Sequence, residues 1–267
     1  MIIISSRENF VDPDRISATG HIIREIDLDK GKTLRENIVF PDLLKELKNK
    51  NVLILVHGYN NEQFEVYDAY QVIENQINKL IPGIYDYVIG YSWPGGDQAL
   101  EWWQVKSRSN SIARVFRFLI EDLAKSASSL DMMTHSLGGR VGLKALKECS
   151  SQNVIRNYFC TAAAVDNECL EPGEEFYESV SSCNRLFVFH SARDRILKKM
   201  YSAAEWDMAL GLYGPEDKNY ISNNAKIIYV ANCKKIISYH GGYKKAVQMY
   251  KYIGECQSKN PSKFKML

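Results

Sequence analysis

The sequence predicts an α/β protein, a single domain with a mainly parallel central sheet and helices on both faces. Short apolar runs rich in β-branched and aromatic residues alternate with longer segments of helical period. Turn residues separate the two kinds of segment. Of the 267 residues, 45% are hydrophobic and 25% are charged, which is ordinary for a globular domain. Strands that alternate with helices in this way form βαβ units, which place helices on both faces of a sheet.

The first fifty residues are less regular than the rest of the chain. Segments 2–5 and 21–27 have the composition of edge strands, and 40–48 is typical of a short helix. No linker separates these segments from the residues after 50. We therefore expect one domain over residues 1–267, with an irregular N-terminal edge over 1–50 and a core over 51–255.

The core contains repeated strand–helix units. The first three units pair an apolar run with a segment of helical period, at 52–56 with 62–80, 87–92 with 98–127, and 131–134 with 137–149. Further strands are predicted at 158–165, 185–190 and 226–230, and a last helix at 243–253. In such a sheet the functional residues gather in the loops beyond the carboxyl ends of the strands.

Composition excludes several classes of protein. The formal net charge is 34 − 32 = +2, without the clustered basic excess of a nucleic-acid-binding platform. The longest apolar run, 52–56, is far shorter than the about 20 residues of a membrane span, and the first ten residues lack the features of a signal peptide. We therefore expect a cytoplasmic location. The six cysteines form no CxxC pair, and no HExxH or phosphate-binding glycine loop occurs, so no metal or cofactor is expected.

The segment around Ser136 is the most informative in the chain. An apolar strand ends at Thr134, Ser136 follows in a tight turn, and a helical pattern begins at once with Gly138. A serine at such a corner is held with its hydroxyl exposed at the N-terminus of the helix, which suits a nucleophile. The usual pattern is G-x-S-x-G, and here Thr134 replaces the first glycine. Taken alone, this pattern also fits an ordinary turn.

Three motifs together resemble the α/β-hydrolase superfamily. They are an HGYN loop at 57–60, a YSWP strand end at 91–94 and an HSLGG nucleophile elbow at 135–139. The chain is most similar to small bacterial α/β hydrolases of uncharacterised function, over roughly residues 50–245. The resemblance implies the α/β-hydrolase fold and a serine nucleophile at Ser136.

The resemblance also implies an oxyanion hole and a base. In the superfamily one donor is the backbone N–H after the nucleophile, here Leu137, and the second comes from an early loop, here Tyr59. His240 follows the last predicted core strand, where the superfamily keeps its base. Without the resemblance, His240 would be an ordinary loop histidine.

The superfamily order of serine, acid and histidine places the acid between 136 and 240. Asp194 follows the strand nearest in sequence to the one that leads to His240, and we expect it to be the acid. Asp166, which ends the apolar run 158–165, is the alternative. Asp194 could instead be a helix N-cap, a common position for aspartate.

Several residues are predicted to line a substrate pocket near the serine. They are His57, Gly58, Trp93, Trp102 and Trp103, although aromatic residues at such spacing also fit a core. The basic cluster Arg193, Arg195, Lys198 and Lys199 is predicted to be a solvated helix face.

The predicted function is a serine hydrolase that cleaves a carboxylic ester or thioester of a small-molecule acyl substrate. The alternative is a catalytically silent scaffold of the same fold that acts as a binding protein. We expect neither a nucleic-acid partner nor a membrane span. The acyl length, the leaving group and the oligomeric state stay open.

Overall fold

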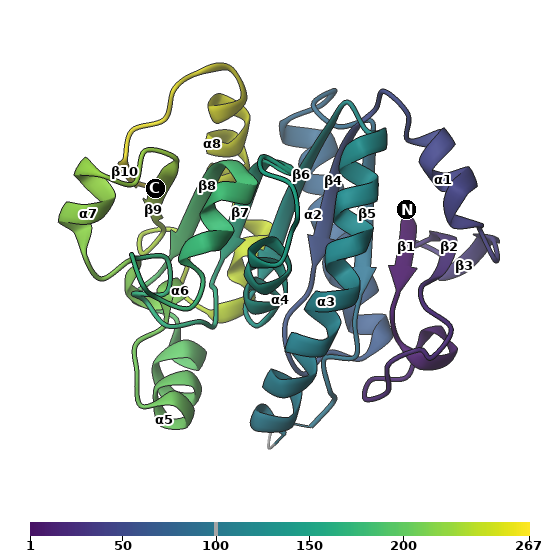
Figure 1. Ribbon diagram of the computed structural model, residues 1–267, viewed down its shortest axis with the longest axis horizontal. Coiled ribbons are helices and arrows are strands. Elements are labelled where there is room, and N and C mark those ends of the chain that lie inside the picture. Colours follow the sequence, from purple (N-terminus) through teal and green to yellow (C-terminus); the bar gives the residue numbers. More distant parts are fainter. Residues whose placement is uncertain (99–100) are drawn as a thin grey trace.

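A computed structural model describes residues 1–98 and 101–267 (Figure 1). Ten strands form one sheet in the order β10-β9-β8-β7-β6-β4-β5-β1-β2-β3. All neighbours pair in parallel except β1 with β2 and β2 with β3. The predicted mainly parallel sheet is therefore confirmed. The strands are β1 Ile2–Ser5, β2 Ile22–Asp27, β3 Lys32–Arg35, β4 Asn51–Val56, β5 Tyr87–Ser92, β6 Ser129–His135, β7 Ile155–Thr161, β8 Cys183–His190, β9 Ile228–Asn232 and β10 Phe264–Met266.

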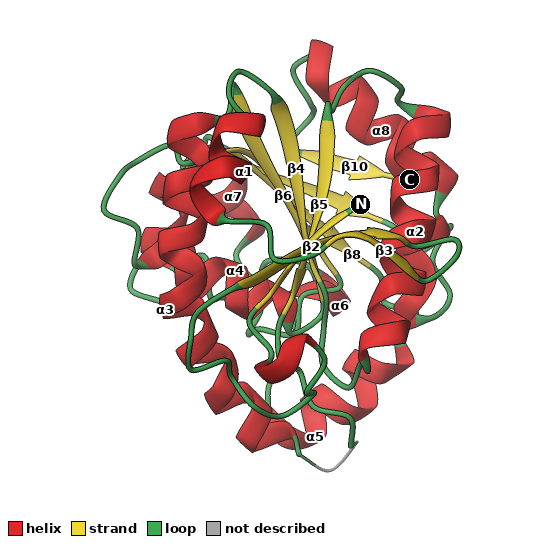
Figure 2. Ribbon diagram, turned by 90° about the vertical axis from the view of Figure 1, so that its right-hand side faces the viewer, coloured by secondary structure: helices red, strands yellow, loops and turns green. Residues whose placement is uncertain are grey.

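Helices cover both faces of the sheet, as predicted (Figure 2). Helices α1, α3 and α4 pack together on one face, and α2 packs with η4 and α8 on the other. The α-helices are α1 Phe40–Glu46, α2 Gln63–Leu80, α3 Trp102–Ser126, α4 Gly138–Lys147, α5 Ser202–Glu205, α6 Leu210–Tyr213, α7 Lys218–Asn223 and α8 Val247–Ser258. Shorter 3-10 or π turns are η1 Glu8–Phe10, η2 Tyr177–Ser182, η3 Leu197–Tyr201 and η4 His240–Lys245.

The N-terminal strands belong to the same sheet as the rest. β1 was expected at an edge, but it lies between β5 and β2, and all four of its residues are buried. β3 forms the actual edge, and no strand was predicted there because its KTLR sequence is mostly exposed and lacks an apolar face. The short strand β10 was also not predicted.

Element boundaries differ from the predictions where the chain leaves the sheet to build a loop. The strand predicted over 158–165 is β7, which ends at Thr161 because Ala162 adopts a left-handed φ of +47°. The helix predicted from 98 begins at Trp102, and residues 99–100 within that prediction lie outside the described residues. The helix predicted over 243–253 is divided between η4 and α8.

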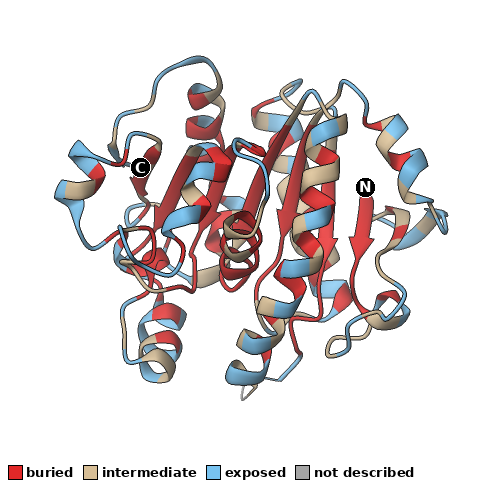
Figure 3. Cartoon of the chain, viewed as in Figure 1, coloured by how far each residue is buried: buried red, intermediate tan, exposed pale blue. Residues whose placement is uncertain are grey.

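The middle of the sheet forms the core. Strands β4 to β8 are buried along almost their whole length (Figure 3). Within the described ranges, no helix combines the length and the apolar character that crossing a membrane requires. The HGYN loop and Ser136 follow the carboxyl ends of the adjacent strands β4 and β6, so the fold brings these two motifs together.

Candidate active site

Ser136 lies in a strained turn between β6 and α4. Its φ is +55°, a left-handed conformation that residues with a side chain rarely adopt. Three backbone hydrogen bonds hold the turn: Ser136 N–H donates to Thr161 O at 3.0 Å, and Ser136 O accepts from Gly139 at 2.9 Å and Ala164 at 3.1 Å. Such strain is typical of a serine held at a nucleophile elbow.

The threonine that replaces the first glycine of the elbow motif is accommodated by a glycine on the helix. Thr134 Oγ1 lies 2.9 Å from the Tyr158 hydroxyl, within hydrogen-bond distance. A Cβ added to Gly142 would come within 3.1 Å of the Thr134 methyl group and 2.8 Å of the Tyr158 hydroxyl. The small residue required at this strand–helix contact therefore stands on the helix rather than on the strand.

The HGYN loop contacts the elbow backbone directly. A Cβ added to Gly138 would lie 2.3 Å from His57 O, and one added to Gly58 would lie 2.8 Å from Ser136 Cβ. Only glycine fits at either position. Within the described part of the chain, neither the Tyr59 N–H nor the Leu137 N–H donates a hydrogen bond. Both N–H groups, one on each segment, are therefore unpaired among the described residues.

The imidazole of His57 supports this loop from beneath. Its Nδ1–H donates to Gly58 O at 2.8 Å, and its Nε2 accepts from Trp93 N–H at 3.0 Å. The Trp93 indole stacks on the ring and donates from Nε1 to His57 O at 2.8 Å. Burial lowers the pKa of His57 well below 6.5, and the Arg7 cation lowers it further. His57 is therefore neutral and acts as a support for the loop.

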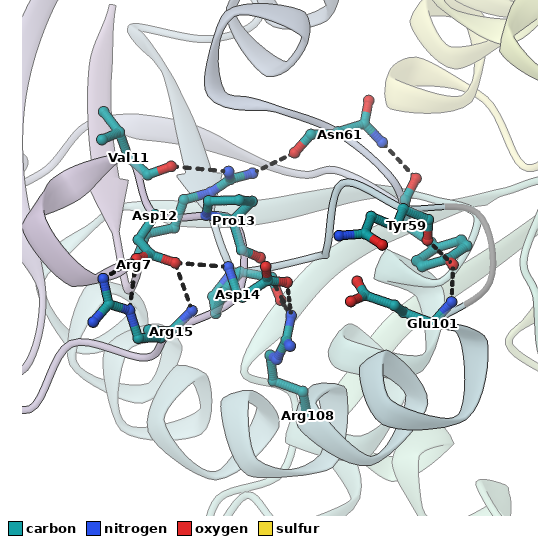
Figure 4. Close-up of polar contacts among 12 residues, drawn as sticks. Arg7, Val11, Asp12, Pro13, Asp14, Arg15, Tyr59, Asn61, Glu101 and Arg108 are labelled. Atoms are coloured by element: carbon teal, nitrogen blue, oxygen red, sulfur yellow. Dashed lines mark hydrogen bonds and ion pairs between the residues drawn. The ribbon is translucent and has the colours of Figure 1, made fainter.

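Arg7 ties the N-terminal segment to the same loop, a contact that was not predicted. Its buried guanidinium reaches between Val11 and Asn61, donating from Nη2 to Asn61 O at 2.9 Å (Figure 4). Asn61 in turn donates from Nδ2 to Tyr59 O at 2.7 Å. Burial lowers the pKa of Arg7 to about 10, which still leaves it charged near neutral pH. In the sequence, Arg7 is a lone arginine after an apolar run, with no signal of this contact.

Asp194 and His240 are in direct contact. His240 Nδ1 lies 2.7 Å from Asp194 Oδ2, and Asp194 is fully buried. The other carboxylate oxygen, Oδ1, accepts the N–H groups of Ile196 and Leu197 at 3.1 Å each. Asp194 thus caps a helical segment with one oxygen and contacts the imidazole with the other. The bond fixes the imidazole proton on Nδ1 and leaves Nε2 able to accept a proton.

A second imidazole, His135, supports His240 from the end of β6, and no role was predicted for it. Its Nε2–H donates to His240 O at 3.0 Å, and the two ring centroids are 4.6 Å apart. Burial lowers the pKa of His135 to about 3, with a further contribution from His240. His135 is therefore neutral at physiological pH.

The alternative acid, Asp166, has a different partner. Tyr201 donates its hydroxyl to Asp166 Oδ1 at 2.5 Å, and burial together with this carboxylate raises the pKa of Tyr201. The backbone of Asp166 forms an isolated bridge with Ala209. Asp166 thus stabilises the chain that packs beside the site, whereas Asp194 contacts the imidazole.

Two apolar cavities meet at Ser136 and His240. One, of about 270 Å³, runs between α2 and α8 and is lined by Ala69, Ile73, Met133 and Met249 among others. The other, of about 310 Å³, is lined mainly by Trp102, Ile196, Leu197, Met200, Tyr201 and Ala204. Among the contacts of the described residues, no hydrogen bond joins the Ser136 hydroxyl to His240.

The predicted pocket residues fall in different places. His57 and Gly58 line the first cavity, and Trp102 lines the second. Trp93 is fully buried behind the HGYN loop, and Trp103 is 59% exposed on the outer side of α3. Three carboxylates that could hold a cation, those of Asp14, Asp97 and Glu101, come within 4.8 Å of one another, but Asp14 already pairs with Arg108.

Solved structures with a similar fold include the lin2722 gene product of Listeria innocua, with 10% identity and a TM-score of 0.49, covering 82% of this chain and 99% of that chain. The Pyrococcus furiosus esterase Pf2001 has 12% identity and a TM-score of 0.46, and the match covers 78% of this chain and 80% of the esterase chain. Phospholipase PlaB from Legionella pneumophila has 16% identity and a TM-score of 0.34, and the match covers 70% of this chain and 39% of the phospholipase chain. No curated protein matches the sequence.

A family model matches residues 33–238, well over half of the chain. The match includes Ser136 and Asp194 and ends just before His240. Its description, an alpha/beta hydrolase of unknown function, agrees with the fold and confirms the predicted resemblance to the α/β-hydrolase superfamily. The chain therefore belongs to the family of α/β hydrolases of unknown function designated DUF900.

Proposed function

We propose that this α/β hydrolase is a serine hydrolase that cleaves carboxylic esters or thioesters through an acyl-enzyme on Ser136. The observation that carries the proposal is the 2.7 Å contact between His240 Nδ1 and a fully buried Asp194, beside a serine in the left-handed elbow conformation. This is the arrangement of nucleophile, base and orienting acid that activates a serine hydroxyl.

Each group has a defined step. Ser136 Oγ attacks the substrate carbonyl while His240 Nε2 takes its proton, and Asp194 stabilises the resulting imidazolium. The N–H groups of Tyr59 and Leu137 donate to the developing oxyanion. His240 then protonates the leaving group. A water that His240 deprotonates attacks the acyl-enzyme, releasing the acid and restoring Ser136.

We expect a hydrogen bond between Ser136 Oγ and His240 Nε2 to form in the substrate complex. Catalytic hydrogen bonds are often long before substrate binds and shorten in the complex. Both side chains line both cavities, so a carbonyl at Ser136 has His240 beside it.

The two cavities favour a substrate with an apolar group on each side of the scissile bond. Because the cavities meet at the serine, an acyl chain can fill one while the leaving group fills the other. Lys244 is the one cationic side chain among the residues that the structure describes as lining either cavity. A neutral ester therefore suits the site better than a highly charged leaving group.

A fluorophosphonate probe tests the nucleophile. We expect the wild type to be labelled and Ser136→Ala to be unlabelled, with hydrolysis of p-nitrophenyl esters reduced on the order of 10⁴–10⁶-fold. Ser128→Ala is the matched control, since Ser128 is exposed and immediately precedes β6, at the end of the strand opposite to Ser136. Failure to label a folded wild type would instead favour the silent binding scaffold.

A further inference from the structure

We propose that the segment 193–208, called here the cap, docks the protein on an anionic lipid surface. The cap follows β8, contains η3 and α5, and ends before α6. α5 and the N-terminal end of α3 project beyond the edge to which the β1 and β5 arrows point, the carboxyl edge where Ser136 lies (Figure 1). The cap is thus placed to lie between a surface and the cleft.

The cap exposes large apolar side chains that no other described residue covers. Ile196, Met200 and Met208 are each about half exposed, and Trp206 is 93% exposed. Exposed apolar groups that gather at one place mark interaction sites, and the amphipathic indole favours the boundary between water and lipid.

Trp206 also occupies a position that stability alone does not explain. It ends α5 with a φ of +57°, where glycine or asparagine is usual, and its N–H donates to Ser202 O. A bulky residue there is strained. The exposed indole contributes no packing in return, so its presence points to a contact made outside the chain.

The charge of the cap is complementary to an anionic surface. Its four exposed cationic side chains form no ion pair or hydrogen bond with any residue that the structure describes; they are Arg193, Arg195, Lys198 and Lys199. The cap has three carboxylates. Asp194 is buried against His240 and Glu205 pairs with Lys106, so Asp207 is the one carboxylate left to offset the four cations. The whole chain carries only +2, so this excess is local. Cations interspersed with exposed apolar groups are typical of segments that bind anionic lipid.

The same side chains border the route to the serine. Ile196 and Met200, half exposed on the cap, also line the second cavity, which reaches Ser136. A lipid chain could therefore pass from the docked surface into the cleft along an apolar path. This last step rests on the proposed hydrolase function, whereas docking itself does not.

Vesicle flotation tests the docking. We expect the full chain to float with vesicles of two parts phosphatidylcholine to one part phosphatidylglycerol, and not with phosphatidylcholine alone. Ser136→Ala should float like the wild type, so docking and catalysis can fail independently. Tryptophan fluorescence should shift to shorter wavelength on binding, and Trp206→Asn, which suits a left-handed φ, should lose most of that shift.

Charge reversal on the cap should weaken binding. Lys198→Glu/Lys199→Glu is expected to reduce affinity for the mixed vesicles at least about tenfold, since each cation near such a surface contributes substantially. The matched control is Lys48→Glu/Lys79→Glu, the same charge change at exposed positions before the amino ends of β4 and β5. No flotation of the wild type, equal weakening by the control pair, or a fluorescence shift unchanged in Trp206→Asn would each overturn the proposal.

Discussion

The two sides of Ser136 present different kinds of group, backbone donors on one side and side chains on the other. On the HGYN side the available groups are backbone N–H donors, held because two glycines let the loop pack against the elbow. On the other side the groups are the side chains of Asp194 and His240. A short hydrogen bond joins these two side chains, and the first N–H groups of the following helical segment hold the Asp194 carboxylate. Each side also contains a neutral imidazole, His57 or His135, that supports the functional group.

This difference shows why residue type alone does not identify a base. His57, His135 and His240 all lie within the site, yet His57 and His135 are neutral, because desolvation lowers the pKa of each. Only His240 of these three combines a carboxylate on one ring nitrogen with a partly exposed ring at the cleft. The surroundings of an imidazole therefore decide whether it supports the fold or carries a proton.

The largest expected effect tests the side-chain half of the comparison. Asp194→Asn should reduce kcat on the order of 10⁴-fold, because an amide favours the wrong tautomer of His240. Asparagine keeps an oxygen that can accept from Ile196 and Leu197, so the fold should survive, as circular dichroism can verify.

The matched variant is Asp166→Asn, which removes a carboxylate bonded to Tyr201. It should change kcat far less than Asp194→Asn does. If the large loss instead follows Asp166→Asn, the two aspartates have exchanged roles, and the contact between Asp194 and His240 serves only to position the loop.

The backbone half of the comparison gives the next largest effect. Gly58→Ala should reduce kcat about 10²–10³-fold, since the added methyl group, 2.8 Å from Ser136 Cβ, displaces the loop that carries the Tyr59 donor. Gly241→Ala is the control on the other side of the serine, where a Cβ meets nothing closer than 3.7 Å. Equal kcat values for the two variants would mean that the loop does not form an oxyanion hole.

Parts of the fold and site follow from local patterns, and these could be predicted. The buried run of β4 and the helical period of α2 indicate their own structure, and the elbow around Ser136 is a turn of consecutive residues. The choice of Asp194 and His240 needed the superfamily order as well. The structure places these two in contact.

Other features depend on contacts between distant segments, which no local pattern reports. Arg7 meets the HGYN loop only after β1 has entered the sheet beside β5. His135 contacts the carbonyl of His240, 105 residues away in the chain. Trp93 was expected at a pocket, but its position beneath His57 depends on how two loops pack.

The smallest expected effect concerns the two supporting imidazoles and their response to acid. A histidine whose folded pKa lies below its unfolded value of 6.5 binds its proton only on unfolding, so the free energy of unfolding falls as pH drops below 6.5. His135, with a pKa of about 3, should contribute up to about 1.4 kcal/mol per pH unit until that pKa is reached. The pKa of His57 is also lowered, so His57 adds to the same loss of stability at low pH.

Urea unfolding between pH 6 and pH 4 measures this slope. His135→Gln should reduce it by about 1.4 kcal/mol per pH unit and also lower kcat, because the support of His240 is altered. His21→Gln is the comparison: burial lowers the pKa of His21 to about 4, but its ring contacts Tyr91, away from the cleft. It should reduce the slope similarly and leave kcat unchanged. If His135→Gln leaves the slope unchanged, His135 does not have the lowered pKa that separates its supporting role from that of His240.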